Sequence, residues 1–194
     1  MARTNPEARL RLVATAADML RRRGMNATSI RELAKAAKAP LGSTYHYFPD
    51  GKKQVITEAI QFAGDKISGM LQKALSHGAV TGVESFLQVW RDVIESTHFN
   101  AGCPVVAAAM EEATNEDVEA AHVVAAAVFN QWRELLGDAL VNEGIEQARA
   151  GALATMIIAS TEGALAMCRA TKDIEPFDQV TGQLHFLLDA ALTH

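Results

Sequence analysis

The sequence contains little cysteine, and its two cysteines do not suggest a site. Cys103 and Cys168 are the only ones among 194 residues, and their distance along the chain matches no metal-ligand spacing. Reduced thiols that pack in the interior are therefore expected, and a disulfide framework is not needed for a chain of this length. We predict no metal site and no cofactor.

Long apolar runs are also missing. The most apolar stretch, from Ala152 to Cys168, is interrupted by Glu162 and by threonine and serine. It falls short of the roughly 20 apolar residues that a membrane-spanning helix needs. The chain begins with MARTNPEARLRL, which predicts the start of a capped helix and not an export signal. We therefore expect a soluble, cytoplasmic protein without a membrane partner.

The motifs that mark common enzyme sites are absent as well. The sequence has no phosphate-binding glycine-rich loop, no His-Glu-x-x-His and no Gly-x-Ser-x-Gly, and its 6 histidines are scattered. Glu111 and Glu112 are adjacent, but we interpret them as a solvated helix edge and not as an acid/base pair. No catalytic residue is predicted, and an enzyme is kept only as an alternative from another class.

Strict alternation of apolar and polar residues, the pattern of a half-buried strand, does not occur, whereas apolar residues repeat with a period near 3.6 along nearly the whole chain. We therefore predict an all-α protein with nine helices. Thr4 or Asn5 is expected to cap the first helix, and Asn115 to cap the long helix that follows it. Capping boxes at Ser29-x-x-Glu32 and Thr81-x-x-Glu84 mark two further helix starts. The expected helices begin and end near Pro6 and Gly24, Ser29 and Ala37, Leu41 and Phe48, Lys52 and Leu75, Thr81 and Ile94, Pro104 and Ala113, Asn115 and Asn142, Ala148 and Thr171, and Phe177 and Leu192.

Charge is unevenly distributed along the chain. Residues 1–56 hold 11 Lys and Arg against 4 Asp and Glu, a net charge of +7. The remaining residues hold 7 against 19, a net charge of −12. This division suggests that the N-terminal end meets a polyanion while the larger part stays soluble.

The basic segment contains two short predicted helices separated by a tight turn. This pattern, preceded by a supporting helix, is typical of a helix-turn-helix module. In the second helix, Thr44, Tyr47 and Phe48 fall on one side and are expected to face a core. Gly42, Ser43, Tyr45 and His46 fall on the other side and could enter a DNA major groove. An ordinary core helix with polar edges is the alternative.

The segment from Thr28 to Lys53, TSIRELAKAAKAPLGSTYHYFPDGKK, resembles the DNA-binding signature of the TetR family of bacterial repressors. In that family a Tyr-His-Tyr-Phe motif ends the recognition helix and a lysine begins the fourth helix. The Phe-Pro-Asp-Gly-Lys-Lys spacing, Gly102-Cys-Pro-Val-Val-Ala and Glu162-Gly-Ala-Leu resemble the drug-resistance-repressor, LmrA/YxaF-like branch. Lys38 departs from the family at a turn position that often holds glycine, and Thr44 departs where a larger apolar residue is common.

The resemblance implies a double-stranded DNA operator as partner. Thr28 would cap the second helix and offer its amide and hydroxyl to a phosphate. Tyr45, His46 and Lys53 would touch phosphates, while Leu41, Gly42 and Ser43 would lie nearest the base edges. The complete predicted DNA-binding set is Thr28, Ser29, Arg31, Pro40, Leu41, Gly42, Ser43, Tyr45, His46 and Lys53.

The resemblance also divides the chain into a DNA-binding domain at 1–50 and a helical domain at 51–194. The family pairs its subunits through the last two helices, so we expect a homodimer that reads a palindrome. Small residues would let the partner helices approach closely; they are Ala152, Ala159, Gly163, Ala164 and Ala166. A ligand-responsive repressor is thus expected, and an architectural DNA-binding protein without an effector is the alternative.

The larger domain is expected to hold a small hydrophobic effector between its helices. Each candidate side chain has an alternative role as ordinary core packing or, for the polar ones, as a hydrogen-bonded structural group. The predicted ligand-binding set is Phe86, Trp90, Met110, Glu111, His122, Phe129, Trp132, Met156 and Glu162.

Overall fold

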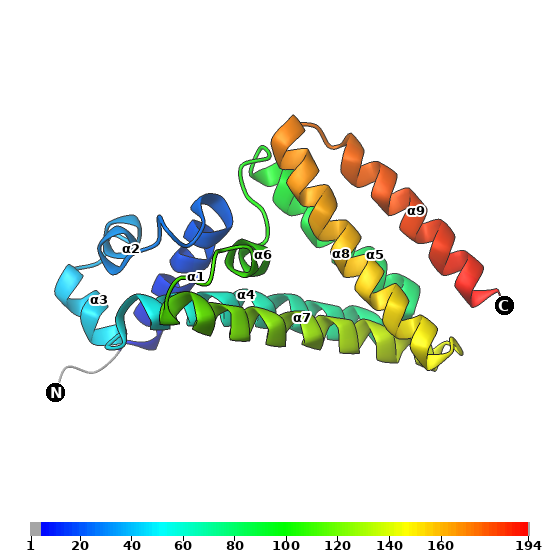
Figure 1. The fold of residues 1–194 in the computed structure, drawn as a ribbon, viewed down its shortest axis with the longest axis horizontal. Helices are drawn as coiled ribbons and strands as arrows, with labels where there is room; N and C mark the ends of the chain where they lie inside the picture. Colours follow the sequence, from blue (N-terminus) through cyan, green and yellow to red (C-terminus); the bar gives the residue numbers. More distant parts are fainter. Residues whose placement is uncertain (1–4, 194) are drawn as a thin grey trace. The chain divides into compact units, whose positions relative to one another are not determined.

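The computed structural model describes residues 5–193, and within them the chain forms nine α-helices and no strand (Figure 1). The predicted all-α fold is therefore confirmed. The helices are α1 (Pro6–Arg23), α2 (Ile30–Ala36), α3 (Leu41–Tyr47), α4 (Gly51–Leu75), α5 (Ala79–Ser96), α6 (Pro104–Ala109), α7 (Glu116–Asn142), α8 (Gln147–Thr171) and α9 (Glu175–Leu192).

Polar side chains cap several of these helices as predicted. Asn5 Oδ1 accepts hydrogen bonds from the amides of Glu7 and Ala8; Thr4, the other candidate, lies outside the described residues. Ser29 Oγ accepts from the amide of Glu32 at 3.2 Å, and Asn115 Oδ1 accepts from the first turn of α7. Each bond satisfies a helical amide that has no partner within its own helix, which fixes where the helix begins.

The capping box predicted at Thr81 is wrong. Helix α5 begins two residues earlier, at Ala79, after Gly78 with φ 115°. The amide of Ala79 donates instead to Glu143 Oε1, at 3.2 Å. A carboxylate from the turn directly after α7 thus supplies the cap, and a distant partner of this kind leaves no local sequence pattern.

Contacts divide the chain into two compact units. The first comprises residues up to 65 together with 103–128. In it, α1 packs against α2 and α6, and α2 packs against α3. Fully buried side chains from successive helices form its core; they are Leu12, Ala16, Leu20, Leu33, Phe48, Ile56 and Ile60. This core supports the short helices α2 and α3 from one side.

The second unit comprises residues 66–102 and those from 129 onward. Helix α8 packs against both α5 and α9. The buried thiol of Cys168 lies on α8, and burial raises its pKa above the ordinary value. It is therefore a packing residue, as predicted, and not a reactive nucleophile. Cys103 is buried as well.

The connection after α5 contains two consecutive non-glycine residues with left-handed backbone, His98 at φ 50° and Phe99 at φ 61°. Such backbone is unfavourable for residues that carry a Cβ. Lys172, at the end of α8, holds the segment: its Nζ donates to the carbonyl of Phe99 at 3.1 Å and to Asn100 Oδ1 at 2.9 Å. The amides of His98 and Phe99 donate to Glu95 O and Ile94 O, so local bonds and a residue more than 70 positions away together hold the turn.

Candidate nucleic-acid interface

Helices α2 and α3 are joined by a tight turn whose shape depends on Lys38. This residue has φ 52°, in the left-handed region, at the position where the family pattern often has glycine. The amide of Ala39 donates to Ala34 O at 2.9 Å, and the amide of Lys38 donates to Lys35 O at 3.2 Å. These two bonds close α2 as a Schellman motif, in which glycine is usually preferred.

The two sides of α3 differ as predicted. Thr44 and Phe48 are fully buried, and the Thr44 hydroxyl donates to Pro40 O at 3.1 Å. On the opposite side, Gly42, Ser43 and His46 are exposed, and Tyr45 has 54% of its surface exposed. Helix α3 therefore holds the core with one side and presents small and polar side chains to solvent with the other.

The start of α3 is shifted by one position from the prediction. Pro40, expected at the first helical position, is extended, with φ −61° and ψ 134°, and precedes the first helical residue, Leu41. Both residues are exposed. The first side chains of the helix are therefore accessible.

Thr28 differs most from its expected role. Ser29, and not Thr28, caps α2. Thr28 is fully buried, its hydroxyl donates to Gly24 O at 3.0 Å, and its amide donates to Met25 O at 3.0 Å. The groups expected to meet a phosphate are thus already paired within the chain. Arg31 and Lys53, by contrast, are exposed.

A group of contacts that the sequence did not reveal fixes the end of α3. The Arg9 guanidinium lies over the Phe48 ring, 5.4 Å from its centroid, and Arg9 Nη2 lies 2.5 Å from Glu58 Oε1. The amide of Asn5 donates to the Tyr47 hydroxyl at 3.2 Å. Helix α1 therefore contacts both the last turn of α3 and the second turn of α4. No local motif marks these residues, because 49 positions separate Arg9 from Glu58.

Four of the predicted ligand-binding side chains form one aromatic cluster in the second unit. Trp132 contacts three other rings: the centroids of Phe86, Trp90 and Phe129 lie 5.9, 6.3 and 5.7 Å from the centroid of its own ring. Such edge-to-face pairs stabilise a core. Trp90 Nε1 is buried without a hydrogen-bond partner in the described part of the chain, which makes it a polar feature of an otherwise apolar interior.

The two predicted methionines lie on the surface. Met110 is 80% exposed because α6 ends at Ala109 and not near Ala113, so Met110 follows the last packed turn. Met156 is 47% exposed on α8. Neither methionine side chain therefore lies in the interior of its unit.

Glu111 and His122 take a structural role in the first unit. Glu111 Oε1 accepts from the amide of Met25 at 3.2 Å, and Oε2 accepts from Asn26 Nδ2 at 3.3 Å. His122 Nε2 lies 3.0 Å from the carbonyl oxygen of Glu111. The pair thus holds the connection between α1 and α2. The remaining predicted residue, Glu162, is half-buried on α8.

One side of α8 is exposed and consists mainly of small or apolar residues. They are Ala152, Met156, Ala159, Gly163, Ala166 and Met167. Phe186 on α9 is also 68% exposed. Ala164, which was expected on this surface, is 1% exposed and packs within the unit. The other predicted small residues lie at helical spacing on a single accessible face.

A helix-turn-helix carried on a supporting helix, with one side of its second helix open to solvent, defines a DNA-binding protein of the helix-turn-helix class. Residues 12–59 match the family model described as bacterial regulatory proteins, tetR family. Residues 79–183 match the C-terminal domain of LmrA/YxaF-like transcriptional regulators. The chain therefore belongs to the TetR family of bacterial transcriptional regulators, and its C-terminal part is of the LmrA/YxaF-like type.

Full-length relatives agree with this assignment. An HTH-type transcriptional regulator of Mycobacterium tuberculosis is 37% identical over 187 residues, which cover 95% of each chain. The HTH-type regulator YxaF of Bacillus subtilis is 26% identical over 184 residues, with 94% of this chain and 95% of YxaF covered. The crystal structure of a TetR regulator from Legionella pneumophila shares the fold, with a TM-score of 0.82, 24% identity and 98% of each chain covered.

Family membership establishes a soluble transcriptional regulator and not an enzyme. It also settles the interpretation of α8. Among the described helices, α8 alone is long and apolar enough to span a membrane by composition. Its buried side packs against α5 and α9, so it is a core helix.

Proposed function

We propose that this regulator is a cytoplasmic repressor that binds a palindromic operator as a homodimer and leaves it when a small hydrophobic effector binds. The observation that carries the proposal is the exposed side of α3 within the most basic part of the chain. Residues 1–50 would form the DNA-binding domain, and residues 51–194 would bind the effector and form the dimer.

In the proposed complex, α3 enters the major groove. Leu41, Gly42 and Ser43 lie nearest the bases, since they begin the exposed side of the helix. Tyr45, His46 and Lys53 contact phosphates, and Arg31 reaches either type of group. We propose Ser29 and Pro40 as backbone contacts, whereas Thr28 acts indirectly by holding the start of α2.

The proposed dimer forms through α8 and α9. Exposed small residues on α8 permit close approach of a partner helix, and the exposed Phe186 would bury a large apolar surface. In a two-fold dimer each subunit presents one copy of α3, and we propose that the two copies read the two halves of a palindromic operator.

The proposed effector site includes the aromatic cluster. A ligand that inserts among Phe86, Trp90 and Phe129 would bury apolar surface and could accept a hydrogen bond from Trp90 Nε1. Release of DNA requires that the ligand prefer one arrangement of the two DNA-binding domains, because equal affinity for both arrangements shifts nothing.

A binding assay over a salt series tests the proposal. Purified protein is titrated into random duplexes and duplexes from its own genomic upstream region, and hydrophobic compounds are then added to the complex. We expect a steep loss of affinity with salt and one favoured palindromic site. A protein with little sequence preference and no ligand response would instead be an architectural DNA-binding protein.

A further inference from the structure

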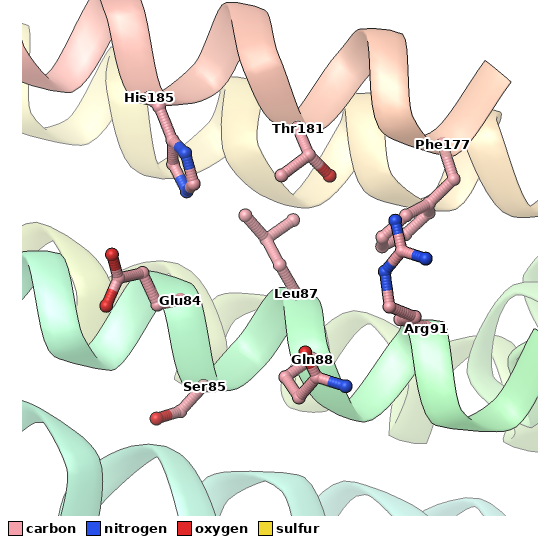
Figure 2. A pocket seen from close by; sticks show the side chains of 8 residues that line it. All are labelled: Glu84, Ser85, Leu87, Gln88, Arg91, Phe177, Thr181 and His185. Atoms are coloured by element: carbon pink, nitrogen blue, oxygen red, sulfur yellow. The ribbon is translucent and has the colours of Figure 1, made fainter. Parts of the chain in front are cut away.

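A second possible ligand site lies away from the aromatic cluster, in a groove between α5 and α9. Its volume is about 420 Å³, within the usual range for small-molecule sites. Figure 2 shows side chains from both helices between them: Glu84, Leu87 and Arg91 project towards α9, and Phe177, Thr181 and His185 project towards α5. From α5 come Glu84, Ser85, Leu87, Gln88 and Arg91, and from α9 come Phe177, Thr181 and His185.

Two polar atoms in this groove are buried without a partner. Thr181 Oγ1 and His185 Nε2 have no hydrogen bond to any described residue. Buried polar groups are nearly always paired, because an unpaired one loses its hydration without compensation. Both side chains project from α9 towards α5, and the carboxylate of Glu84 is turned towards His185 (Figure 2). A molecule bound at this end of the groove could form polar contacts with Thr181 Oγ1, His185 Nε2 and the Glu84 carboxylate.

The charges around the groove determine whether a cation or an anion would bind there. Among the described residues that line it, Arg91 is the one lysine or arginine, and it is already compensated: Nη1 lies 3.1 Å from Glu95 Oε1, and Nη2 pairs with Asp178 Oδ1. Glu84 has no ion pair within the described residues. Carboxylates therefore outnumber cations here, which disfavours an anion and favours a cation at the Glu84 end.

An apolar surface lies beside this polar end. Leu87 and Phe177 are buried and line the groove, and the Arg91 guanidinium lies 5.8 Å from the centroid of the Phe177 ring. Because Arg91 is at the Phe177 end, a second cation is better placed at the opposite end, beside Glu84 and His185. The same helix α5 directs Phe86 and Trp90 into the aromatic cluster, so the groove uses a different side of it.

We propose that the groove between α5 and α9 binds a small protonated amine with an apolar, ring-sized body. The ammonium forms an ion pair with Glu84 and donates hydrogen bonds to Thr181 Oγ1 and His185 Nε2. The apolar body lies against the edges of Leu87 and Phe177 that line the groove. This site goes beyond the repressor function, and its occupancy does not depend on whether the aromatic cluster holds an effector.

The test uses the full chain without DNA and three probes of similar shape: 2-phenylethylammonium, neutral 2-phenylethanol and anionic 3-phenylpropionate. Binding is measured by calorimetry and by NMR of protein with ¹³C-labelled histidine, with the His185 signal assigned from the His185→Gln variant. We expect the ammonium to bind saturably and to shift the His185 signal. Its affinity should exceed that of the alcohol by about tenfold.

Matched variants separate a site from general attraction to an acidic protein. Glu84→Gln and Glu134→Gln remove the same charge from exposed positions, on α5 and α7. We expect only Glu84→Gln to weaken ammonium binding, by about tenfold, and Thr181→Val to weaken it severalfold. The proposal is overturned by equal binding of all three probes, by equal effects of the two glutamine variants, or by no saturable binding of the ammonium to the folded wild-type protein.

Discussion

Arg9 on α1 and Phe48 after α3 form a cation–π pair, with 5.4 Å between the guanidinium carbon and the ring centroid. Because Phe48 is fully buried, the pair fixes the point at which the chain leaves α3. Arg9 also pairs with Glu58 at 2.5 Å, and Gln54 Nε2 donates to the same Glu58 oxygen at 2.9 Å. The orientation of α3 relative to α4 thus depends on one arginine.

Replacing Arg9 should therefore impair DNA binding without removing a phosphate contact. We expect Arg9→Ala to lower operator affinity about tenfold, because α3 is held less precisely, while the slope of log affinity against log salt stays unchanged. Arg11→Ala, which removes an exposed charge from the same helix, is the control. A slope reduced by about 1 in the Arg9 variant would instead identify Arg9 as a phosphate ligand.

Lys53 and Ser43 should affect DNA binding differently. Loss of the exposed Lys53 cation should weaken binding to all duplexes alike and reduce the salt slope by about 1. Ser43→Ala should change the preference among operator variants, because it removes a group nearest the bases. Both variants are compared in the same panel of duplexes. If Lys53→Ala altered only base preference, the two roles would have to be exchanged.

Lys38→Gly should stabilise the protein. The φ of 52° disfavours any residue with a Cβ by about 1 kcal/mol or more, although glycine also gains entropy in the unfolded chain. We expect a net gain in unfolding free energy of about 0.5 to 1 kcal/mol. The control, Lys35→Gly within α2, should cost about 1 kcal/mol. Urea titration measures the unfolding free energy of both variants. A loss of stability in the Lys38 variant would contradict backbone strain at Lys38.

Two glycines of α4 should respond oppositely to alanine. A Cβ on Gly64 would lie 2.5 Å from Val128 Cγ2, whereas a Cβ on Gly69 would meet nothing within 4 Å. We expect Gly64→Ala to lower the unfolding free energy by roughly 1 to 3 kcal/mol through overpacking. Gly69→Ala should raise it by about 0.5 to 1 kcal/mol. Equal changes in thermal unfolding would argue against close packing of α4 on α7 at this point.

The proposed dimer interface can be tested with one added charge. Ala159→Arg places a long cation on the exposed small-residue face of α8, where it would prevent close approach of a partner helix. We expect sedimentation velocity to show monomers and operator affinity to fall by at least about tenfold. The control Ala126→Arg, at an exposed position of α7, should still sediment as a dimer. A dimer that survives Ala159→Arg would place the interface elsewhere.

The sequence predicted most helices because their evidence is local. Ser29 and Asn115 both cap helices within three residues of themselves, and Gly144, with φ 95°, ends α7 where expected. The start of α5 was missed for the opposite reason, since its capping carboxylate comes from Glu143, 64 positions away. Helical period also does not specify how long a short helix continues, which explains the early end of α6.

In the candidate sites, too, the features that could be predicted depend on local sequence patterns, and those that were missed depend on contacts with other segments. The exposed side of α3 follows from its period and from the motif around Tyr45, whereas the buried state of Thr28 depends on a turn with Gly24 that the motif does not encode. The aromatic cluster was anticipated from four ring positions. The roles of Glu111 and His122 were not, because each depends on a contact with a separate segment.

The hydrogen bonds that Lys172 donates to Phe99 and Asn100 join two segments that are synthesised at different times. Local bonds already close this left-handed turn, since the amides of His98 and Phe99 donate to Glu95 O at 3.1 Å and to Ile94 O at 3.0 Å, and Lys172 adds a bond to the Phe99 carbonyl. A nascent chain that stops before residue 172 therefore lacks the ammonium that completes this corner. During synthesis, this contact with the connection after α5 forms only after nearly nine-tenths of the polypeptide has been made.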